Sequence, residues 1–565
     1  MTADGVISSQ PRDGRAQVAW RAIHGVVIRG PAIVLILCSV SADLVAVFGG
    51  DPLGIWQVLP AGPVAGDWLS AELSSVAFLL IGIALLRRKR AGFWLGLAVA
   101  GGALVVQGAS LDHPVSGVAA GVLAVALLAT RDEYDVGTSR RVAILASGLV
   151  VACGILVAGA AALIPSGTDV VGTATDAVGA LFDLATPIAV PGITAAGAAL
   201  VLARIVYLVA TILVLDPVED ERSPETVASA RVALRRLGAG SLFPYQLEPQ
   251  CVPFSDEAGS AVISVAGVGR AAVVLGDPAG APDAGHELLR EWARRCDRRD
   301  LVPVVYQASA EAVERLRAGG WHAVHVGREA VVDPIAFDLR TPALANLRHT
   351  VTRSRRGGVR VVWSSSGVDG LGDPRIAAGM ADLDAAWRHG AGPRLGFTVG
   401  RFDPQDQREC AIAVAIDEDR ELEAFVVLRP TGADGGWMLD LMRRRRDGVP
   451  GAVEACLVTA IEELATLGVR NLSLGLAPLA GLDIRTGPLA ERALAGGARL
   501  IRPLYDHEGL AFFKGKFGPT WEPRYLVLRH WWDLPAAAFA LLRLHLGGSW
   551  PRVLTSVLAG LAPAR

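Results

Sequence analysis

Hydrophobic and polar positions divide the chain into two parts with different patterns. Long apolar stretches fill residues 26–48, 68–86, 91–108, 114–130, 142–164 and 193–215. Most of these stretches approach the roughly 20 residues that a helix needs to cross a bilayer. From residue 217 onward, short apolar runs alternate with amphipathic ones, which is typical of an α/β region. The pattern predicts an N-terminal all-α transmembrane bundle of about six helices over residues 1–216.

Positive charges between the apolar stretches predict their orientation. Arginine and lysine gather before the first stretch and within 87–90 and 131–141, whereas 49–67, 109–113 and 165–192 contain neither. Because positively charged loops stay in the cytoplasm, this alternation places both ends of the bundle there. We therefore expect a multi-pass protein of the cell (cytoplasmic) membrane with its catalytic region in the cytoplasm. Arg204 lies inside the sixth stretch. It either has a functional role, forms an ion pair with an acidic residue, or extends its charged end to the membrane surface.

The α/β region repeats one order of elements. Strands are predicted at 261–268 and 271–275, followed by a helix at 286–298, a strand at 302–306 and a helix at 310–318. A second series has strands at 411–417, 422–429 and 437–441, a helix at 453–467 and a strand at 472–474. The repetition predicts two related α/β domains, at 217–385 and at 386–535, of which the second is catalytic. Residues 536–565 predict an amphipathic helical tail that lies along the membrane surface or packs against the domain.

Composition narrows the classes of function. The chain is 52% hydrophobic with a net charge of −2, so a nucleic acid would have to bind a local basic patch. Six cysteines form no C-x-x-C pair and ten histidines form no ligand cluster, which indicates reduced thiols and no metal site. Arg235–Gly240 fits the R-x-x-G-x-G loop that binds coenzyme A. Since this loop ends a helical run, where glycine is an ordinary stop signal, we expect no cofactor.

Lysine is rare in this chain, and its positions point to chemistry. Only Lys89, Lys514 and Lys516 occur, whereas arginine supplies almost all other positive charge. A lysine is a compact point charge whose pKa shifts on burial, so arginine does not replace it at a chemical site. The two lysines at 514 and 516 are interpreted as groups that hold a phosphate or stabilise a developing negative charge. The alternative is an accident on a solvated loop.

Three segments carry the remaining candidate residues. Asp440-Leu441-Met442-Arg443 ends one predicted strand, residues 474–480 end another, and residues 505–525 contain the paired lysines. Ligands of open α/β sheets bind beyond the carboxyl ends of strands. Arg443–Arg446 forms either a solvated turn or a patch for RNA phosphate. Asp440 either caps a turn or holds a substrate ammonium group.

The order and spacing of several short motifs resemble one family, the aminoacyl-phosphatidylglycerol synthases. This family is also called the multiple peptide resistance factors or phosphatidylglycerol lysyltransferases. The motifs are Leu275-Gly276-Asp277-Pro278, Val305-Tyr306-Gln307, Gly327-Arg328-Glu329-Ala330, Leu395-Gly396-Phe397-Thr398-Val399-Gly400-Arg401-Phe402-Asp403, Asp440-Leu441-Met442-Arg443, Leu476-Ala477-Pro478-Leu479, Phe513-Lys514-Gly515-Lys516-Phe517 and Trp521-Glu522-Pro523-Arg524-Tyr525-Leu526.

The resemblance implies two tandem acetyltransferase-like (GNAT-like) folds that use aminoacyl-tRNA instead of coenzyme A. It implies transfer of an aminoacyl group, lysyl or alanyl, to a glycerol hydroxyl of phosphatidylglycerol at the cytoplasmic leaflet. Such a reaction modifies membrane charge and resistance to cationic antimicrobial peptides. The implied partners are the charged tRNA, phosphatidylglycerol and the bilayer, with a homo-oligomer as a further expectation. The longest family members have about twice as many membrane spans and flip their product, which six spans leave open.

The resemblance also suggests roles for particular residues. Lys514 or Lys516 would stabilise the oxyanion of the tetrahedral intermediate. Asp440 would hold the α-ammonium group or assist deprotonation of the lipid hydroxyl, and Glu522 would orient a lysine or arginine. The expected catalytic residues are thus Asp440, Lys514, Lys516 and Glu522, and the expected substrate-binding residues are Arg443, Arg524, Tyr505 and Arg401. Two alternatives stay open: a different lipid or a peptidoglycan precursor as acceptor, and a non-catalytic lipid transporter or scaffold.

Overall fold

A computed structural model describes nine segments of the chain: residues 29–41, 68–110, 114–134, 223–299, 301–390, 396–403, 409–419, 421–481 and 507–546. The chain forms two compact units. One comprises residues 1–214 with 298–300, and the other comprises residues 215–297 and 301–565.

The N-terminal unit is helical throughout its described residues. Residues 29–41 are helical, and they are followed by α2 (Trp68–Leu86), α3 (Arg90–Ser110), α4 (Pro114–Ala129) and the short η2 (Arg131–Glu133). Leu35, Leu85 and Leu127 are fully buried where these helices pack together. Among the helices that the structure describes, none combines the length and the apolar character needed to cross a membrane. Of the six predicted stretches, those at 142–164 and 193–215, including Arg204, lie outside the described residues.

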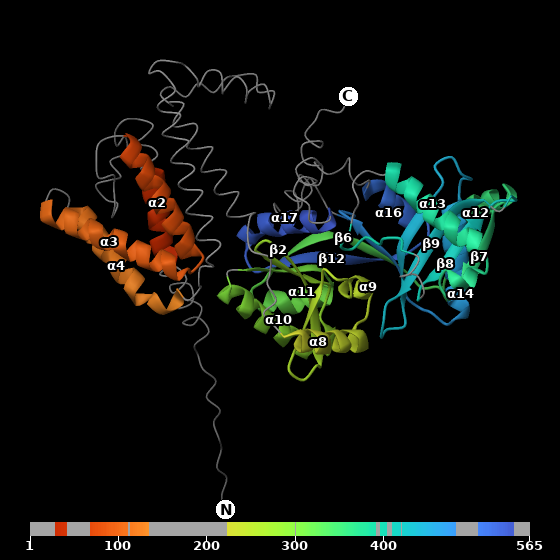
Figure 1. The fold of residues 1–565 in the computed structure, drawn as a ribbon, viewed down its shortest axis with the longest axis horizontal. Coiled ribbons are helices and arrows are strands. Elements are labelled where there is room, and N and C mark those ends of the chain that lie inside the picture. The colour runs from red at the N-terminus through yellow and green to blue at the C-terminus, as the bar shows by residue number, and fades with distance from the viewer. Residues whose placement is uncertain are drawn as a thin grey trace, which may run out of the picture. The chain divides into compact units, whose positions relative to one another are not determined.

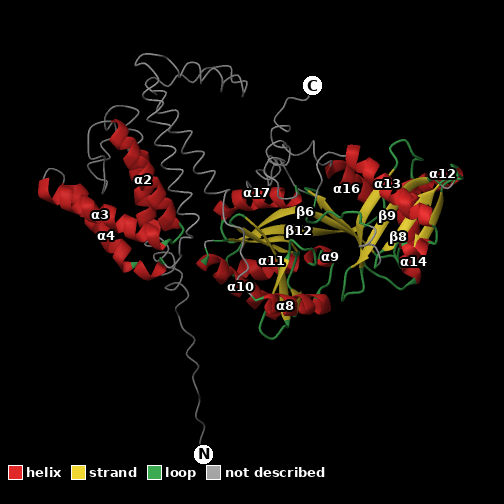
Figure 2. Ribbon diagram, viewed as in Figure 1, coloured by secondary structure: helices red, strands yellow, loops and turns green. Residues whose placement is uncertain are grey.

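The C-terminal unit is built on one large mixed sheet (Figures 1 and 2). Its strands lie in the order β1-β2-β3-β5-β12-β6-β11-β10-β9-β8-β7, and β4 pairs with β2. The strands are β1 (Val252–Ser255), β2 (Ala261–Val268), β3 (Ala271–Leu275), β4 (Ala279–Gly280), β5 (Val302–Ala308), β6 (His322–Val332), β7 (Arg360–Ser364), β8 (Ala411–Ile416), β9 (Leu422–Pro430), β10 (Trp437–Arg444), β11 (Leu472–Pro478) and β12 (Thr520–Leu528). We call β1 to β6 with their helices the first half, and β7 to β12 with theirs the second half.

Helices cover both faces of this sheet. They are α8 (Pro224–Leu237), α9 (Phe243–Gln246), α10 (Pro282–Arg298), α11 (Ala310–Ala318), η3 (Pro342–Leu344), α12 (Ala345–Arg356), η4 (Asp369–Leu371), α13 (Pro374–Gly390), α14 (Ala452–Thr466), α16 (His507–Gly515), η6 (Trp531–Asp533) and α17 (Leu534–His545). In the first half, α10 and α11 pack on one face and α17 packs on the other (Figure 1). In the second half, α12 and α14 cover one face and α13 covers the other.

Burial on both faces explains the strand sequences. All five residues of β3 and all six of β8 are buried, so these strands read as continuous apolar runs instead of alternating ones. Alternate residues of β3 contribute to two different cores: Val273 faces α17, whereas Val274 faces α10 and α11. Hydrophobic burial on both faces therefore holds this part of the sheet in one register.

Helix α8 begins and ends where local sequence signals place it. Ser223 caps its N-terminus by accepting a hydrogen bond from the Thr226 amide at 3.3 Å, and Pro224 occupies the first turn. Gly238 ends the helix, and a Cβ at this position would lie 2.1 Å from the Phe243 ring. The prediction that Arg235–Gly240 terminates a helix is confirmed.

The two halves repeat one topology and exchange strands. Each half contains a parallel pair, β3 with β5 and β10 with β11, preceded by antiparallel strands. The last strand of the first half, β6, pairs with β11 of the second half, and the last strand of the second half, β12, pairs with β5 of the first half. The strands β6 and β12 also pair with each other. The α/β region thus resembles two tandem acetyltransferase-like folds, as predicted, joined into one continuous sheet.

The C-terminal tail packs on the sheet as far as it is described. Ala537, Ala540 and Leu546 are buried, and α17 lies against β2, β3 and β5. Two positions were predicted for the tail, along the membrane surface or against the domain. Residues 534–546 pack against the domain. The rest of the predicted tail, residues 547–565, lies outside the described residues.

Candidate active site at the junction of the two halves

The parallel strands of the second half separate soon after they meet. The pairing of β10 with β11 covers only Trp437 with Leu472 and Met438 with Ser473, whereas β3 and β5 pair over five residues. A bulge between Leu439 and Leu441 then interrupts the pairing of β10 with β9, and Asp440 occupies it. Bulges re-aim side chains and are frequent next to active sites. The predicted site residues on β10 and β11 thus follow the point where the two strands part.

Asp440 is enclosed by groups from both halves. Its Oδ1 accepts a hydrogen bond of 2.9 Å from the hydroxyl of Tyr245, which belongs to α9 of the first half. A Cβ on Gly400 would lie 2.3 Å from the same oxygen, so only glycine permits this approach. Burial raises the pKa of Asp440 above its usual range, although the nearby Arg429 guanidinium and the Tyr245 hydrogen bond act in the opposite direction.

Lys514 is a buried amine near the second of the parted strands. It lies in the last turn of α16, its residue is only 4% exposed, and its Nζ donates a 2.8 Å hydrogen bond to the Leu476 carbonyl of β11. Gly475 has a φ of +82°, and a Cβ there would lie 3.4 Å from this nitrogen. Burial lowers the pKa of Lys514 to about 7, and the carboxylate of Glu329 partly counteracts this effect. At neutral pH the amine therefore exists in both protonation states.

Glu329 of β6 interacts with both Lys514 and Arg524, and Arg524 belongs to the motif at residues 521–526. Its Oε2 accepts a 2.6 Å hydrogen bond from Nε of Arg524, and its Oε1 accepts one from the Ser473 hydroxyl. Burial alone would raise the pKa of Glu329, but Arg524, Ser241 and Ser473 outweigh it and lower the pKa. Glu522 lies 3.0 Å from the second terminal nitrogen of Arg524. The guanidinium of Arg524 thus bridges two carboxylates.

Lys516 occupies a different environment from Lys514. Its side chain is 30% exposed, and its Nζ lies 2.9 Å from Glu454 in the first turn of α14. The same ammonium group lies over the rings of Phe512 and Phe513, at 5.6 Å and 5.4 Å from their centroids. The two lysines therefore point to opposite environments, and Lys516 is the one that solvent reaches.

The predicted substrate-binding residues are distributed around this site. Arg443 is buried, donates a 2.8 Å hydrogen bond to Asp384, and lies over the Trp387 ring at 3.9 Å. A guanidinium held in this way by α13 anchors the end of β10. Arg401 is exposed and lies 3.7 Å from Glu248. Tyr505 lies outside the described residues.

Several neighbours of the predicted residues were not found by sequence reasoning. Glu329, Tyr245 and Asp384 each contact a predicted residue, but none stands near it in the sequence. Arg429 acts on Asp440 through its charge. Glu329 had one visible signal, because it is the carboxylate of the family motif Gly327-Arg328-Glu329-Ala330. Tyr245 had none, since a short helix after a glycine-rich turn looks like an ordinary connection.

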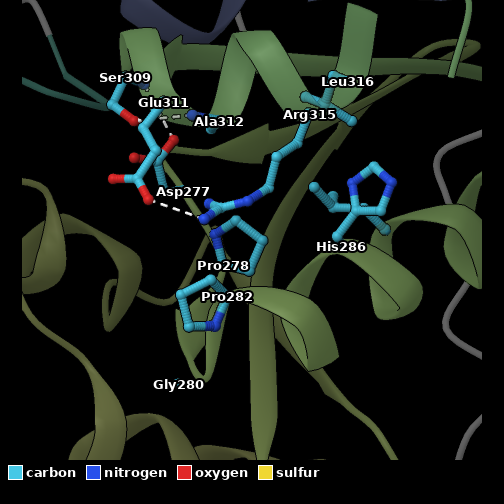
Figure 3. Close-up of a pocket in the computed structure, with 11 residues that line it drawn as sticks. Asp277, Pro278, Gly280, Pro282, His286, Ser309, Glu311, Ala312, Arg315 and Leu316 are labelled. Atoms are coloured by element: carbon cyan, nitrogen blue, oxygen red, sulfur yellow. Dashed lines mark hydrogen bonds and ion pairs between the residues drawn. The ribbon is translucent and has the colours of Figure 1, made fainter. Parts of the chain in front are cut away.

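A separate cavity of about 200 Å³ lies in the first half, at the carboxyl ends of β3 and β5 (Figure 3). Asp277, Ser309 and His286 line it together with the ion pair of Glu311 and Arg315, whose closest atoms are 2.8 Å apart. Of the predicted site residues that the structure describes, none lines this cavity. It occupies, in the first half, the position that the candidate site occupies in the second.

Five of the six cysteines lie within the described residues. Cys38, Cys251, Cys296, Cys410 and Cys456 are all buried. Within the described segments, no cluster of three or more histidine, cysteine, aspartate or glutamate residues is arranged to hold a metal ion.

Comparison with known proteins identifies the family of the chain. The family model described as "Phosphatidylglycerol lysyltransferase, C-terminal" matches residues 197–528, which is more than half of the chain. The lysylphosphatidylglycerol biosynthesis bifunctional protein LysX of Mycolicibacterium gilvum is 30% identical over 263 residues, covering 44% of this chain and 23% of that protein. Phosphatidylglycerol lysyltransferase of Bacillus subtilis is 26% identical over 351 residues, covering 61% of this chain and 40% of that protein. The matched region thus spans less than half the length of these relatives.

Solved structures support the same fold. The C-terminal domain of a putative lysylphosphatidylglycerol synthetase from Agrobacterium fabrum superposes with a TM-score of 0.50 at 24% identity, covering 58% of this chain and 98% of that chain. The structure of L-PGS from Bacillus licheniformis gives the same TM-score, identity and coverage. The large match to the family model, the shared motifs and the shared fold lead to one conclusion: the chain belongs to the phosphatidylglycerol lysyltransferase C-terminal family, the family that its motifs indicated.

Proposed function

We propose that this chain is an integral membrane aminoacyltransferase that moves a lysyl or alanyl group from aminoacyl-tRNA to a glycerol hydroxyl of phosphatidylglycerol. Family membership supports this function, since the relatives are named for lysyl transfer to this lipid and for its biosynthesis. The apolar stretches of residues 1–216 and the arginine alternation between them support a multi-pass position in the cell membrane with the α/β region in the cytoplasm.

The buried amine of Lys514 is the observation that carries the proposal. A general base works best when its pKa lies near the working pH, and burial sets the pKa of Lys514 to about 7. Acyl transfer between two hydroxyl groups needs a group that accepts a proton and returns it. Lys514 meets this requirement at a buried position beside the parted strands.

The reaction then proceeds without a cofactor, because the donor ester is already activated. Neutral Lys514 accepts the proton of the glycerol hydroxyl while the lipid oxygen attacks the aminoacyl carbonyl carbon. The resulting ammonium group lies next to the oxyanion and stabilises it. When the tetrahedral intermediate collapses, the bond to the tRNA ribose oxygen breaks, and Lys514 returns the proton to that oxygen. The new ester joins the aminoacyl group to the lipid, and one proton has been shuttled.

The other residues orient the reactants. The carboxylate of Asp440 holds the α-ammonium group of the donor, and Glu329 keeps Lys514 and Arg524 in place. Lys516 is the accessible cation for a phosphate of either substrate. Bringing a soluble polyanion and a membrane lipid together makes proximity a large part of the rate enhancement.

The test uses the full chain in nanodiscs that contain phosphatidylglycerol. We expect radiolabelled lysyl-tRNA or alanyl-tRNA to yield an aminoacylated phosphatidylglycerol, identified by thin-layer chromatography and mass spectrometry. Ribonuclease treatment of the donor should abolish the product, whereas coenzyme A should have no effect. A labelled product other than aminoacyl-phosphatidylglycerol would show that the acceptor is a different molecule. If neither charged tRNA is consumed, the transferase function is wrong and a binding or transport role takes its place.

A further inference from the structure

One short segment of the first half touches the candidate site at two points. Residues 238–251 connect α8 to β1 and include α9. The Tyr245 hydroxyl donates a hydrogen bond to Asp440, and the Ser241 side chain lies near Glu329 and lowers its pKa. Four residues span at most about 14 Å of extended chain, so these two contacts hold Asp440 and the Glu329 cluster within reach of one loop.

The second half fixes this segment in place. The Ala433 amide donates to the Gly238 carbonyl at 2.8 Å, and the Gly240 amide donates to Asp434 at 3.1 Å. Both partners lie in the turn between β9 and β10, which leads directly to Asp440. The segment is therefore hydrogen-bonded both to the turn that precedes β10 and, through Tyr245, to Asp440 on β10 itself.

The hydroxyl of Tyr245 meets Asp440 in a confined space. Tyr245 is buried in the core that includes Phe397 and Met438. The bulge in β10 removes Asp440 from the regular alternation, and the Gly400 backbone closes off the carboxylate on another side. The Gly400 backbone and the hydrogen bond to Tyr245 together restrain the direction in which the two carboxylate oxygens face.

We propose that Tyr245 is a positioning residue for Asp440, which fixes the carboxylate through Oδ1 so that Oδ2 is the oxygen that meets the ammonium group of the aminoacyl donor. This inference rests on the proposed transferase function. The hydroxyl that positions Asp440 comes from α9 of the first half, so both halves contribute to the site on β10.

The surrounding charges predict what removal of the hydroxyl does. Arg429 of β9, Arg443 of β10 and Tyr245 lower the pKa of Asp440, whereas burial and Glu248 raise it. Burial and the Asp440 charge raise the pKa of Tyr245, so the phenol stays protonated and serves as a donor. Without the hydroxyl, one lowering influence is lost, and the carboxylate becomes protonated at a higher pH.

The experiment compares Tyr245→Phe with Tyr525→Phe in the full chain. Tyr525 is the matched control, because it is a tyrosine of the same unit that packs on His325 at 5.4 Å between ring centroids. Phenylalanine retains the ring and its packing, so both variants should fold. We expect Tyr245→Phe to lower kcat about tenfold to hundredfold, with the KM for phosphatidylglycerol unchanged, because a hydrogen bond to a charged group is lost. The acid limb of its pH–rate profile, which the pKa of Lys514 sets, should stay in place, because Tyr245 acts on Asp440.

An infrared titration tests the same contact without activity. The carboxylic acid band of Asp440 is the one that disappears in Asp440→Asn, and its midpoint gives the protonation of that residue alone. Tyr245→Phe should raise this midpoint and shift the band to higher frequency, whereas Tyr525→Phe should change neither. An unchanged band and midpoint in Tyr245→Phe would overturn the positioning role. If the parent shows no transferase activity, the proposed function fails separately, and the infrared band still decides the role of Tyr245.

Discussion

Replacing Lys514 with methionine should abolish lipid aminoacylation and at the same time make the protein more stable. Methionine has a similar length and no charge, so it fills the same buried space. The native lysine has a pKa of about 7 in the folded protein, against 10.5 for the free side chain. Between these two values the unfolded chain binds more protons than the folded one, so stability rises as the pH increases from 7 to 10.5.

The size of the effect follows from this difference. Each pKa unit corresponds to about 1.4 kcal/mol, so burying the amine costs about 4 kcal/mol at pH 7. The hydrogen bond from Lys514 to the Leu476 carbonyl returns about 1 kcal/mol of this, and methionine cannot make it. The net gain for Lys514→Met is then about 3 kcal/mol at pH 7, which is several degrees in transition temperature. At pH 10 most of this gain should vanish, because this pH is close to the ordinary pKa of 10.5 and neutralising the amine on folding then costs little.

Thermal unfolding of the full chain, followed by tryptophan fluorescence at pH 7 and pH 10, measures this difference. Lys516→Met is the control, since it removes the contact with Glu454 from a partly exposed position and should lower the transition temperature slightly at both pH values. A transition of Lys514→Met that is unchanged or lower at pH 7 would refute the claim that burial destabilises the charged amine. Wild-type transferase activity in this variant would refute its role as the base.

Two further experiments test the same cluster. Glu329→Gln removes the charge that raises the pKa of Lys514, so the acid limb of the pH–rate profile should move to lower pH. An unmoved limb would show that Glu329 does not influence the protonation of Lys514. Of Lys514→Arg and Lys516→Arg, at least one should lose aminoacylation on the order of a hundredfold, while Lys89→Arg should match the parent. Parental turnover in both site variants at equal protein levels would contradict the catalytic assignment.

The sequence predicted the composition of the site better than its contacts. Asp440 and Lys514 were found from their motifs, because residue type and local spacing are visible in one dimension. Their partners were not, because Tyr245 stands 195 positions before Asp440 and Glu329 stands 195 positions before Arg524. A hydrogen bond across that separation depends on tertiary packing, which no local pattern records.

Charge runs were the least informative signal. Arg443 and Arg444 are neighbours in one run of four arginines, yet Arg443 is buried against Asp384 and Arg444 is exposed. The alternation of a strand explains the difference, since successive side chains of β10 point to opposite faces. The sequence left a solvated turn and a phosphate patch both open for Arg443–Arg446, and the buried ion pair of Arg443 shows that charge and accessibility must be judged separately.

The exchange of β6 and β12 explains why the candidate site needs both halves. Strand order within a sheet is set by non-local pairing, so the repeated pattern predicted two units but not that each would complete the other. In the resulting sheet, Glu329 comes from the last strand of the first half and Arg524 from the last strand of the second, and the register of β6 with β12 sets them within hydrogen-bonding distance. Tyr245 adds a second such contact through α9. Since an uncompensated buried charge is strongly destabilising, a half that lost its partner would leave Glu329 or Arg524 unpaired in a buried position. The electrostatics of the site and the integrity of the sheet are therefore maintained by the same residues.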